Sequence, residues 1–322
     1  MSYPQQRLTR TRQSQTIRDL VSEVTLRAED LMYPIFVVHG SNIKQPIEAL
    51  QGQFQWSIDQ LSRLIETLQT KGIRSVMLFG VPAHKDQFAS ENYDSNGIVQ
   101  QAITLFKQQA PEILVAADIC LCGYTPHGHC GVLNHSGDID EYATLDVLAK
   151  TAISYAKAGA DMVAPSGMTD GMVQAIRQGL DHAGWQQTMI MSYAIKYASN
   201  SYGPFRYASQ TELKGDRKAY QMDYRNQKEA MLEAQLDQQE GADILMIKPA
   251  MNYLDIITRL SDQSSLPLAA YHVSGEYAMI TAAAERGWIE KIPMLIESLT
   301  AIKRSGARII LTYGALDVID AL

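Results

Sequence analysis

The chain has 322 residues, of which 46% are hydrophobic and 20% are charged, proportions typical of a folded globular protein. Its formal net charge of −7 provides no basic surface for nucleic acid or anionic membranes, and no apolar run approaches the roughly 20 residues that span a bilayer. The basic N-terminal stretch has no apolar core and the three cysteines cannot all pair, so we expect a cytoplasmic protein in a reducing compartment.

The first segment, residues 1–28, is expected to be an N-terminal arm that contacts another subunit, with an organelle transit peptide as the alternative. Residues 29–322 are expected to form one domain, because no linker or change of composition divides them. Eight short apolar runs alternate there with amphipathic stretches, and they begin at Asp30, Ser75, Ile113, Asp161, Thr188, Asp243, Pro267 and Arg308. This pattern predicts eight buried strands separated by helices.

Three of the intervening helices have recognisable ends. Ser57 is expected to cap a helix that stops at Gly72, and Thr144 to cap a helix that stops at Gly159. A third helix is expected to stop at Gly241. In each case the next apolar run begins soon after the glycine, which is typical of alternating helices and strands.

Eight strands that alternate with helices favour a parallel sheet closed into a (β/α)₈ TIM barrel. An open, doubly wound sheet is the alternative. The chain lacks the glycine-rich dinucleotide loop after its first strand, and it contains neither a phosphate-binding loop nor a nucleophile elbow. The barrel is therefore the better prediction, and it places functional side chains at the carboxyl ends of the strands.

All three cysteines lie within eleven positions, at Cys120, Cys122 and Cys130. Alternate residues of an extended chain face the same side, so the first two thiols can point together and the third can return through a glycine-rich turn. Three protein ligands with an open fourth position are typical of catalytic zinc. His127 or His129 could instead close the site as a fourth ligand. The remaining alternative is that the cysteines are buried as small hydrophobic side chains.

Two lysines directly follow strongly apolar runs, Lys196 after MIMSYAI and Lys248 after DILMI. At the mouth of a barrel, burial disfavours the ammonium form, and two neighbouring ammonium groups lower each other's pKa further. A neutral amine is the nucleophile that forms a Schiff base with a ketone or aldehyde. The alternative is that each lysine reaches solvent or pairs with an acid such as Asp118 or Asp255.

The segment 197–222 is too long for a simple connection, and we interpret it as a lid. It carries Arg206 and Arg217, whose guanidinium groups suit a substrate carboxylate, although both could be ordinary surface charges. Ser274 and Tyr313, near the ends of the last two strands, offer hydroxyl groups for a second carboxylate. The residues alone thus indicate Schiff-base chemistry on a small keto acid.

Four stretches resemble the porphobilinogen synthases, also called 5-aminolevulinate dehydratases: DICLCGYTPHGHCGVL, MSYAIKYASNSYGPFR, ADILMIKPAMNYLD and YHVSGEYAMI. The resemblance runs from about Arg18 to Leu316, with the stretches in the family's order and spacing. It implies a (β/α)₈ barrel with an N-terminal arm. It also implies a hydro-lyase of heme biosynthesis that condenses two molecules of 5-aminolevulinate into porphobilinogen with loss of two waters.

The resemblance implies roles for individual residues. Lys248 would form the Schiff base with the first-bound substrate and Lys196 the second. The cysteines at 120, 122 and 130 would bind catalytic zinc, with Asp118 beside the metal and the two histidines in supporting positions. The residues expected to contact substrate are Arg206, Arg217 and Gln221 on the lid, and Ser274 and Tyr313 for the other substrate's carboxylate.

The resemblance further implies a homo-octamer and a regulatory magnesium site between subunits. Glu233 matches the magnesium ligand, but Leu232 stands where the family usually has arginine. Other departures, at Tyr197, Ser201 and Arg308, bear on lid packing and subunit contacts rather than on nucleophiles or zinc ligands.

Two rival functions fit part of this pattern. A class I aldolase-like barrel would use a single lysine and hold zinc only for structure. A non-catalytic barrel would bind zinc for storage or assembly and form no covalent adduct with a keto acid.

Overall fold

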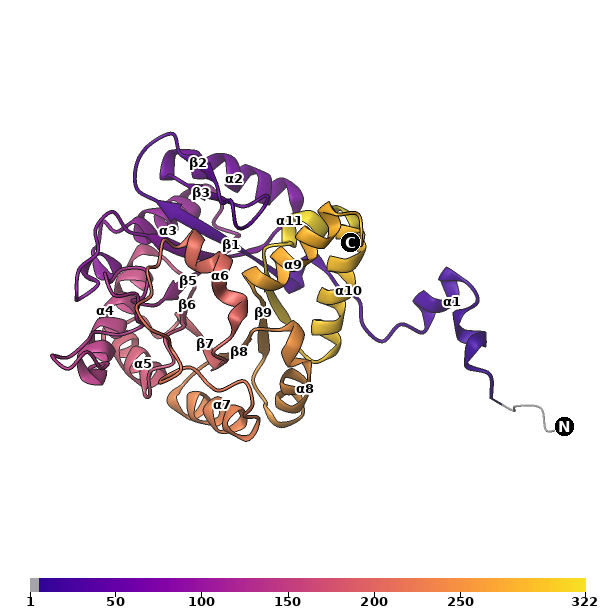
Figure 1. Cartoon of the computed structure of the whole chain (residues 1–322). Coiled ribbons are helices and arrows are strands. Elements are labelled where there is room, and N and C mark those ends of the chain that lie inside the picture. Colours follow the sequence, from indigo (N-terminus) through magenta and orange to yellow (C-terminus); the bar gives the residue numbers. More distant parts are fainter. Residues whose placement is uncertain (1–5) are drawn as a thin grey trace.

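The structure, a computed structural model, describes residues 6–322. Eight parallel strands close into a barrel, because β10 pairs with β1 as well as with β9 (Figure 1). These strands are β1 (Leu31–Val38), β4 (Ser75–Val81), β5 (Leu114–Ile119), β6 (Met162–Pro165), β7 (Met189–Lys196), β8 (Ile244–Lys248), β9 (Leu268–His272) and β10 (Ile309–Thr312). The predicted (β/α)₈ barrel is confirmed, and the open sheet is wrong.

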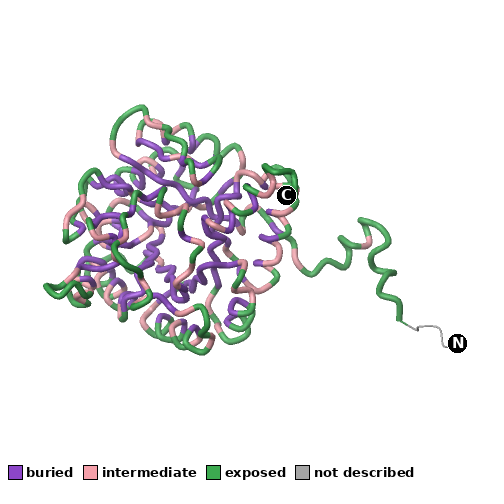
Figure 2. The backbone as a smooth tube through the Cα atoms, viewed as in Figure 1, coloured by how far each residue is buried: buried purple, intermediate pink, exposed green. Residues whose placement is uncertain are grey.

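Each predicted apolar run contains one barrel strand. The strands read as continuous apolar runs because a parallel barrel strand is buried on both faces, by side chains inside the barrel and by helices outside it. Every residue of β1, β8 and β9 is buried. Figure 2 shows the buried backbone concentrated in the strands and on the inward sides of the surrounding helices.

Helices surround the barrel on its outside (Figure 1). They are α2 (Ile58–Lys71), α3 (Ile98–Gln109), α4 (Glu141–Ala158), α5 (Met172–His182), α7 (Lys228–Glu240), α8 (Leu254–Gln263), α9 (Ser274–Glu285), α10 (Lys291–Arg304) and α11 (Ala315–Val318). The predicted ends at Gly72, Gly159 and Gly241 are confirmed. All three glycines adopt the left-handed conformation, with φ of 76°, 106° and 106°.

Of the two predicted helix starts, the one at Thr144 is wrong, whereas the one at Ser57 is confirmed without the expected capping bond. Helix α4 begins one turn before Thr144, because the Asp140 side chain caps it by accepting a hydrogen bond from the amide of Ala143 at 3.0 Å. Ser57 does occupy the position before α2, but its hydroxyl serves the preceding loop. It accepts from the amide of Ile43 at 2.8 Å and donates to Asp59 at 2.6 Å, and it makes no capping bond.

A short hairpin was not predicted. Strands β2 (Lys44–Pro46) and β3 (Phe54–Trp56) pair antiparallel, and β3 extends the barrel sheet beside the end of β1. Each strand has only three residues and β2 is wholly exposed, so neither carries the alternating apolar pattern that identifies a strand.

The described part of the N-terminal segment projects away from the barrel (Figure 1). It contains the 3₁₀ helix η1 (Leu8–Arg12) and helix α1 (Gln15–Leu20), and it leads through η2 (Ala28–Asp30) into β1. Residues 1–5 of the expected arm lie outside the described residues, and the division at residue 28 stays a prediction. No helix within residues 6–322 is long and apolar enough to cross a membrane.

Candidate active site

A small closed cavity of about 20 Å³ lies at the carboxyl ends of the barrel strands, beneath the segment 197–222. It is lined by residues from four strand ends and from that segment: Asp118, Cys120, Cys122, Ser166, Lys196, Tyr202, Phe205, Arg206, Arg217 and Lys248. Both predicted lysines, two of the three cysteines and both predicted arginines therefore meet at one point. Residues up to 130 positions apart in the chain supply this cavity.

The two lysines end neighbouring strands in the same register, so Lys196 of β7 lies directly beside Lys248 of β8. Both are buried. The Nζ of Lys196 donates a hydrogen bond to the backbone oxygen of Ser166. Burial, and to a smaller extent the neighbouring Lys196, lower the pKa of Lys248 to about 7, and the carboxylate of Asp118 only partly opposes them. Lys248 can thus be a neutral amine near neutral pH.

Four aromatic rings surround the amine of Lys248. Its Nζ lies 5.1 Å from the ring centres of Tyr193, Tyr202 and Phe205 and 4.6 Å from that of Tyr271. Tyr193 and Tyr271 come from the barrel strands, whereas the other two rings come from the covering segment. The rings remove the amine from water, which is the physical cause of its lowered pKa.

Asp118 lies next to both lysines, at the end of β5. Burial raises the pKa of its carboxyl group to about 6, although the two lysines act in the opposite direction. The carboxyl of Asp118 and the amine of Lys248 therefore have similar proton affinities. A proton can pass between such groups at little cost in free energy.

The three cysteines form one buried cluster, with their Sγ atoms within 4.8 Å of one another. All three are free thiols. Hydrogen bonds from the other two thiols lower the pKa of Cys130 well below its usual value, whereas Cys120 has a raised pKa because it donates to its neighbours. Three close sulfur donors match the ligand preference of zinc and leave a fourth position open, so the cluster fits the predicted metal.

The predicted histidines do not join this cluster. In the described residues the group of possible metal ligands consists of the cysteines alone. The Nε2 of His129 lies 2.9 Å from the backbone oxygen of Lys214, so it must donate, and Nδ1 lies 3.2 Å from the hydroxyl of Tyr220. The Nδ1 of His127 accepts a hydrogen bond from the amide of His129 at 3.1 Å. Both histidines thus organise the loop instead of completing a closed site.

The segment 197–222 covers the cavity, as expected of a lid. Its η4 (Asn200–Tyr202) and α6 (Gly203–Ala208) supply two of the aromatic rings, and its later part is joined to the cysteine loop. Arg217 donates to the backbone oxygen of Gly128 at 2.8 Å, and the amide of Cys130 donates to the hydroxyl of Tyr220 at 3.4 Å. The lid and the cysteines are consequently held in one arrangement.

The lid residues predicted to contact substrate share one feature. Each has a buried side-chain nitrogen without a hydrogen-bond partner in the described structure: Nε of Arg206, Nε of Arg217 and Nε2 of Gln221. Buried donors that lack a partner are costly, and a ligand that accepts from them removes the cost. These three donors are therefore suited to bind an anionic group such as a carboxylate.

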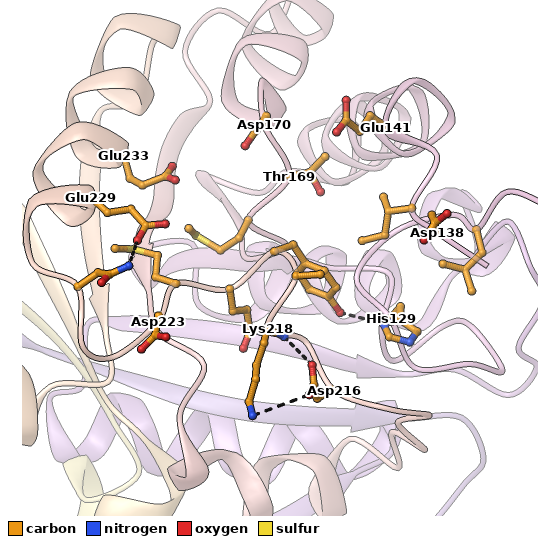
Figure 3. A pocket seen from close by; sticks show the side chains of 18 of the residues that line it. His129, Asp138, Glu141, Thr169, Asp170, Asp216, Lys218, Asp223, Glu229 and Glu233 are labelled. Atoms are coloured by element: carbon orange, nitrogen blue, oxygen red, sulfur yellow. Dashed lines mark hydrogen bonds and ion pairs between the residues drawn. The ribbon is translucent and has the colours of Figure 1, made fainter. Parts of the chain in front are cut away.

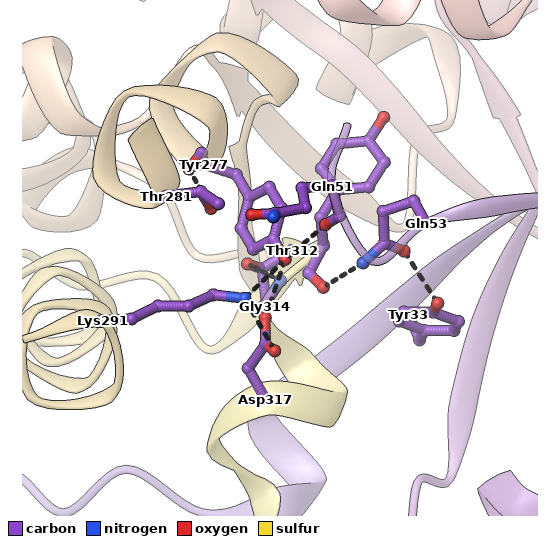
Figure 4. A network of polar contacts seen from close by, with 10 residues as sticks. Tyr33, Gln51, Gln53, Tyr277, Thr281, Lys291, Thr312, Gly314 and Asp317 are labelled. Carbon is purple, nitrogen blue, oxygen red and sulfur yellow. Dashed lines mark hydrogen bonds and ion pairs between the residues drawn. The ribbon is translucent and has the colours of Figure 1, made fainter. Parts of the chain in front are cut away.

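Ser274 and Tyr313 lie close to the cavity without lining it. The Ser274 hydroxyl accepts from the amide of Phe205 at 3.0 Å, so it holds the lid helix in place. The Tyr313 hydroxyl is 2.8 Å from that of Tyr271, one of the rings around Lys248. Gln53, which Figure 4 shows in a network with Tyr33, donates to the backbone oxygen of Tyr313 at 3.1 Å. The predicted contact of Ser274 and Tyr313 with a substrate carboxylate stays a prediction.

Glu233 lies apart from the cysteines, on α7. It lines a separate cavity of about 530 Å³, together with the acidic residues Asp170, Glu229 and Glu141 (Figure 3). Burial raises the pKa of Glu233, and the nearby carboxylate of Asp170 raises it further. The neighbouring Leu232 is largely exposed. The predicted magnesium site stays a prediction.

Sequence reasoning missed several residues in and around the cavity. Ser166 is the last residue of the predicted fourth run, so its place at a strand end was a usable signal. Tyr202 and Phe205 belong to the predicted lid, but nothing local indicates that they face a lysine. Tyr193 and Tyr271 lie inside apolar runs, where an aromatic residue is most simply read as part of the core.

Comparison with known proteins agrees with this geometry. The family model described as delta-aminolevulinic acid dehydratase matches residues 5–321. The chain is 50% identical over 319 residues to the delta-aminolevulinic acid dehydratase of Synechococcus elongatus, covering 98% of each chain. It is 47% identical over 321 residues to that of Archaeoglobus fulgidus, covering 99% of each.

Among solved structures, the fold is similar to that of delta-aminolevulinic acid dehydratase (porphobilinogen synthase) from Toxoplasma gondii in complex with the product porphobilinogen. The TM-score is 0.96 and the identity 41%, with 99% of this chain and 92% of the other covered. A match over almost the whole length, in sequence and in structure, leaves one conclusion: the chain belongs to the delta-aminolevulinic acid dehydratase family.

Proposed function

We propose that this protein condenses two molecules of 5-aminolevulinate into porphobilinogen, a step of tetrapyrrole (heme) biosynthesis, through Schiff bases at Lys248 and Lys196. The observation that carries the proposal is the pair of buried amines at adjacent strand ends, in one closed cavity with two of the cysteines. A single-lysine aldolase would not need the second buried amine. A zinc-storage barrel would need neither amine.

The amines supply the covalent chemistry. Neutral Lys248 attacks the ketone carbon of one substrate, and Lys196 attacks that of the other, and each imine forms with loss of one water. One carbon–carbon bond and one carbon–nitrogen bond then join the two substrates, and both lysines leave as free amines. Asp118 is placed to accept and return protons, because its carboxyl and the Lys248 amine have similar pKa values. Covalent capture of both substrates also replaces a collision in solution by a local reaction.

The lid residues hold and shield the substrates. Arg206, Arg217 and Gln221 bring their free buried donors to one substrate carboxylate. Ser274 and Tyr313 are proposed to bind the other, after exchanging their present hydrogen bonds for the carboxylate oxygens. The lid excludes water, which protects the imines from hydrolysis.

The family is metal-dependent, and we propose zinc as the catalytic metal of this chain. Cys120, Cys122 and Cys130 would hold it, because three close thiolates are preferred zinc ligands. When bound, zinc would supply a Lewis acid that polarises an oxygen of the substrate beside it.

The test is formation of porphobilinogen by the purified protein, before and after treatment with a zinc chelator. We expect activity to disappear on chelation and to return with added zinc. Lys248→Met and Lys196→Met should each abolish turnover, whereas Lys218→Met, which changes an exposed lysine of the lid, should leave it unchanged. Full activity after complete removal of the metal would refute the role of zinc, and an active Lys248→Met variant would refute the Schiff-base mechanism.

We also propose that the protein is a cytoplasmic homo-octamer whose N-terminal arm makes subunit contacts. The arm exposes the apolar side chains of Leu8, Leu20 and Val21, which a contact with another subunit would bury. Light scattering should give the mass of eight chains for the full-length protein and a smaller mass after deletion of residues 1–27. An unchanged mass would refute a role of the arm.

Glu233 is proposed to bind a regulatory magnesium ion near Asp170 and Glu229, since carboxylate oxygens are the ligands magnesium prefers. Magnesium should then raise the activity of the wild type but not that of Glu233→Gln. An equal response of both proteins would refute the site.

A further inference from the structure

The carbonyl group of Cys120 lies where the barrel ladder stops. The pairing of β5 with β4 ends at Ala117, and its pairing with β6 ends at Ile119, whose oxygen accepts from the amide of Ser166 at 3.0 Å. Cys120 follows immediately and is buried. A buried backbone carbonyl without a ladder partner must find another donor or destabilise the fold.

Asn92 supplies that donor from a distant part of the chain. It lies in η3 (Ser90–Tyr93), is 1% exposed, and its Nδ2 donates to the backbone oxygen of Cys120 at 3.3 Å. The direction of this bond is unambiguous, because a carbonyl oxygen only accepts and Nδ2 is the only donor of the asparagine side chain.

Further hydrogen bonds fix Asn92 itself. Its Oδ1 accepts from the hydroxyl of Tyr155 on α4 at 2.6 Å, and its backbone oxygen accepts from Nε2 of Gln100 on α3 at 3.0 Å. The side chain therefore cannot turn without breaking its bond to α4, and the backbone that carries it is tied to α3. Asn92 thereby holds the peptide group that follows Cys120 in a fixed position relative to α3 and α4.

We propose that Asn92 is a positioning residue for the zinc site, an inference that rests on the proposed function. The three Sγ atoms lie within 4.8 Å of one another, so a small rotation about Cys120 moves one donor away from the other two. Asn92 prevents this rotation by holding the peptide group next to Cys120. Metal-site residues that act through a ligand in this way commonly change metal affinity about 10- to 100-fold when they are replaced.

The decisive variant is Asn92→Asp, which keeps the shape and the acceptor for Tyr155 but replaces the donor to Cys120 by an oxygen. We expect its zinc affinity, measured by competition with a chromophoric chelator, to fall about 10- to 100-fold. With Co²⁺ as the probe, the thiolate-to-cobalt absorption bands should shift or weaken. Wild-type affinity together with a wild-type cobalt spectrum would overturn the proposal.

A second variant covers the case in which Asn92→Asp does not fold. Tyr155→Phe leaves the bond to Cys120 in place and removes only one bond that fixes Asn92, so the loss of zinc affinity should be smaller. Thr151→Val is the matched control. Thr151 lies one turn before Tyr155 on the same helix, and its buried hydroxyl donates to the backbone oxygen of Val147, also in α4. If the control lost as much affinity as Tyr155→Phe, the effect would be a general loss of stability and the proposal would fail.

The proposed function can be tested in the same samples. If wild-type protein binds no zinc, the metal site fails and the role of Asn92 fails with it. If the wild type binds zinc and both Asn92→Asp and Tyr155→Phe bind it equally well, only the role of Asn92 fails. Borohydride trapping of 4-oxopentanoate at Lys248 should proceed in Asn92→Asp as in the wild type, because the lysines are held by β7 and β8.

Discussion

Schiff-base formation at Lys248 should depend steeply on pH, because only the neutral amine attacks a ketone. Burial and the neighbouring Lys196 lower the pKa of Lys248 to about 7, so about half of the amine is neutral at that pH. An ordinary lysine, with a pKa of about 10.4, would be neutral in only about one molecule in 2,500 at pH 7. The cavity thus raises the amount of reactive amine about 1,000-fold.

The assay uses 4-oxopentanoate, which has the ketone and carboxylate of the substrate but no amino group, so the reaction stops at the imine. Cyanoborohydride traps the adduct, and intact-protein mass spectrometry gives the rate from about pH 5 to about pH 9. We expect the rate to rise with a midpoint near pH 7 and then to level off. Lys248→Met should form no adduct at this position.

Two variants test the physical cause of the lowered pKa. Lys196→Met removes a positive neighbour, so the midpoint for Lys248 should move to higher pH. Asp118→Asn removes the negative neighbour that favours the ammonium form, so the midpoint should move to lower pH. A rate that still climbs at about pH 9, or two variants that move the midpoint in the same direction, would refute the electrostatic explanation.

Cys130→Ala should remove most of the bound zinc and most of the activity, because two thiolates hold zinc far more weakly than three; a full zinc content by elemental analysis would contradict this. Arg217→Leu should raise KM about 10- to 100-fold, because the substrate carboxylate loses a charged hydrogen bond. The control variant Lys218→Leu changes the exposed neighbouring lysine and should have the wild-type KM. Asp237 is a buried residue of α7, and burial raises its pKa to about 7. The folded state therefore binds this proton more tightly than the unfolded chain, and stability falls as the pH rises from about 4 to about 7. Asp237→Asn removes this pH-dependent loss of stability. The melting temperature of the variant should therefore exceed that of the wild type by more at about pH 8 than at about pH 4. An equal difference at both pH values would show that Asp237 is not protonated in the folded protein.

The barrel was predictable because its signals are local. Strands buried on both faces appear as continuous apolar runs, and Gly159 and Gly241 end the preceding helices with a conformation that glycine adopts easily. The places of Lys196, Lys248, Cys120 and Cys122 were predictable for the same reason, since they lie at the ends of apolar runs and the ends of parallel strands meet at one rim of a barrel.

Other features were not predicted, one because two nearby residues compete for the same helix cap and the rest because they depend on partners distant in the chain. Thr144 has the chemistry of a helix cap, but Asp140 occupies the position from which a side chain reaches the first free amides. Ser274 and Tyr313 lie near the cavity but outside the set of residues that lines it, and their present hydrogen bonds go to Phe205 and Tyr271. No local pattern links Asn92 to Cys120, which follows 28 residues later.

The sequence by itself determined the number and order of the barrel strands, the fold class and which residue types stand at the strand ends, because hydrophobic periodicity and turn chemistry act between near neighbours. Only the tertiary structure decided that the three sulfur atoms lie within 4.8 Å of one another and that the pKa of Lys248 falls to about 7. The sulfur cluster and the lowered pKa both depend on burial and on how closely the strand ends and the lid approach one another. These are properties of packing, to which segments far apart in the chain contribute at once.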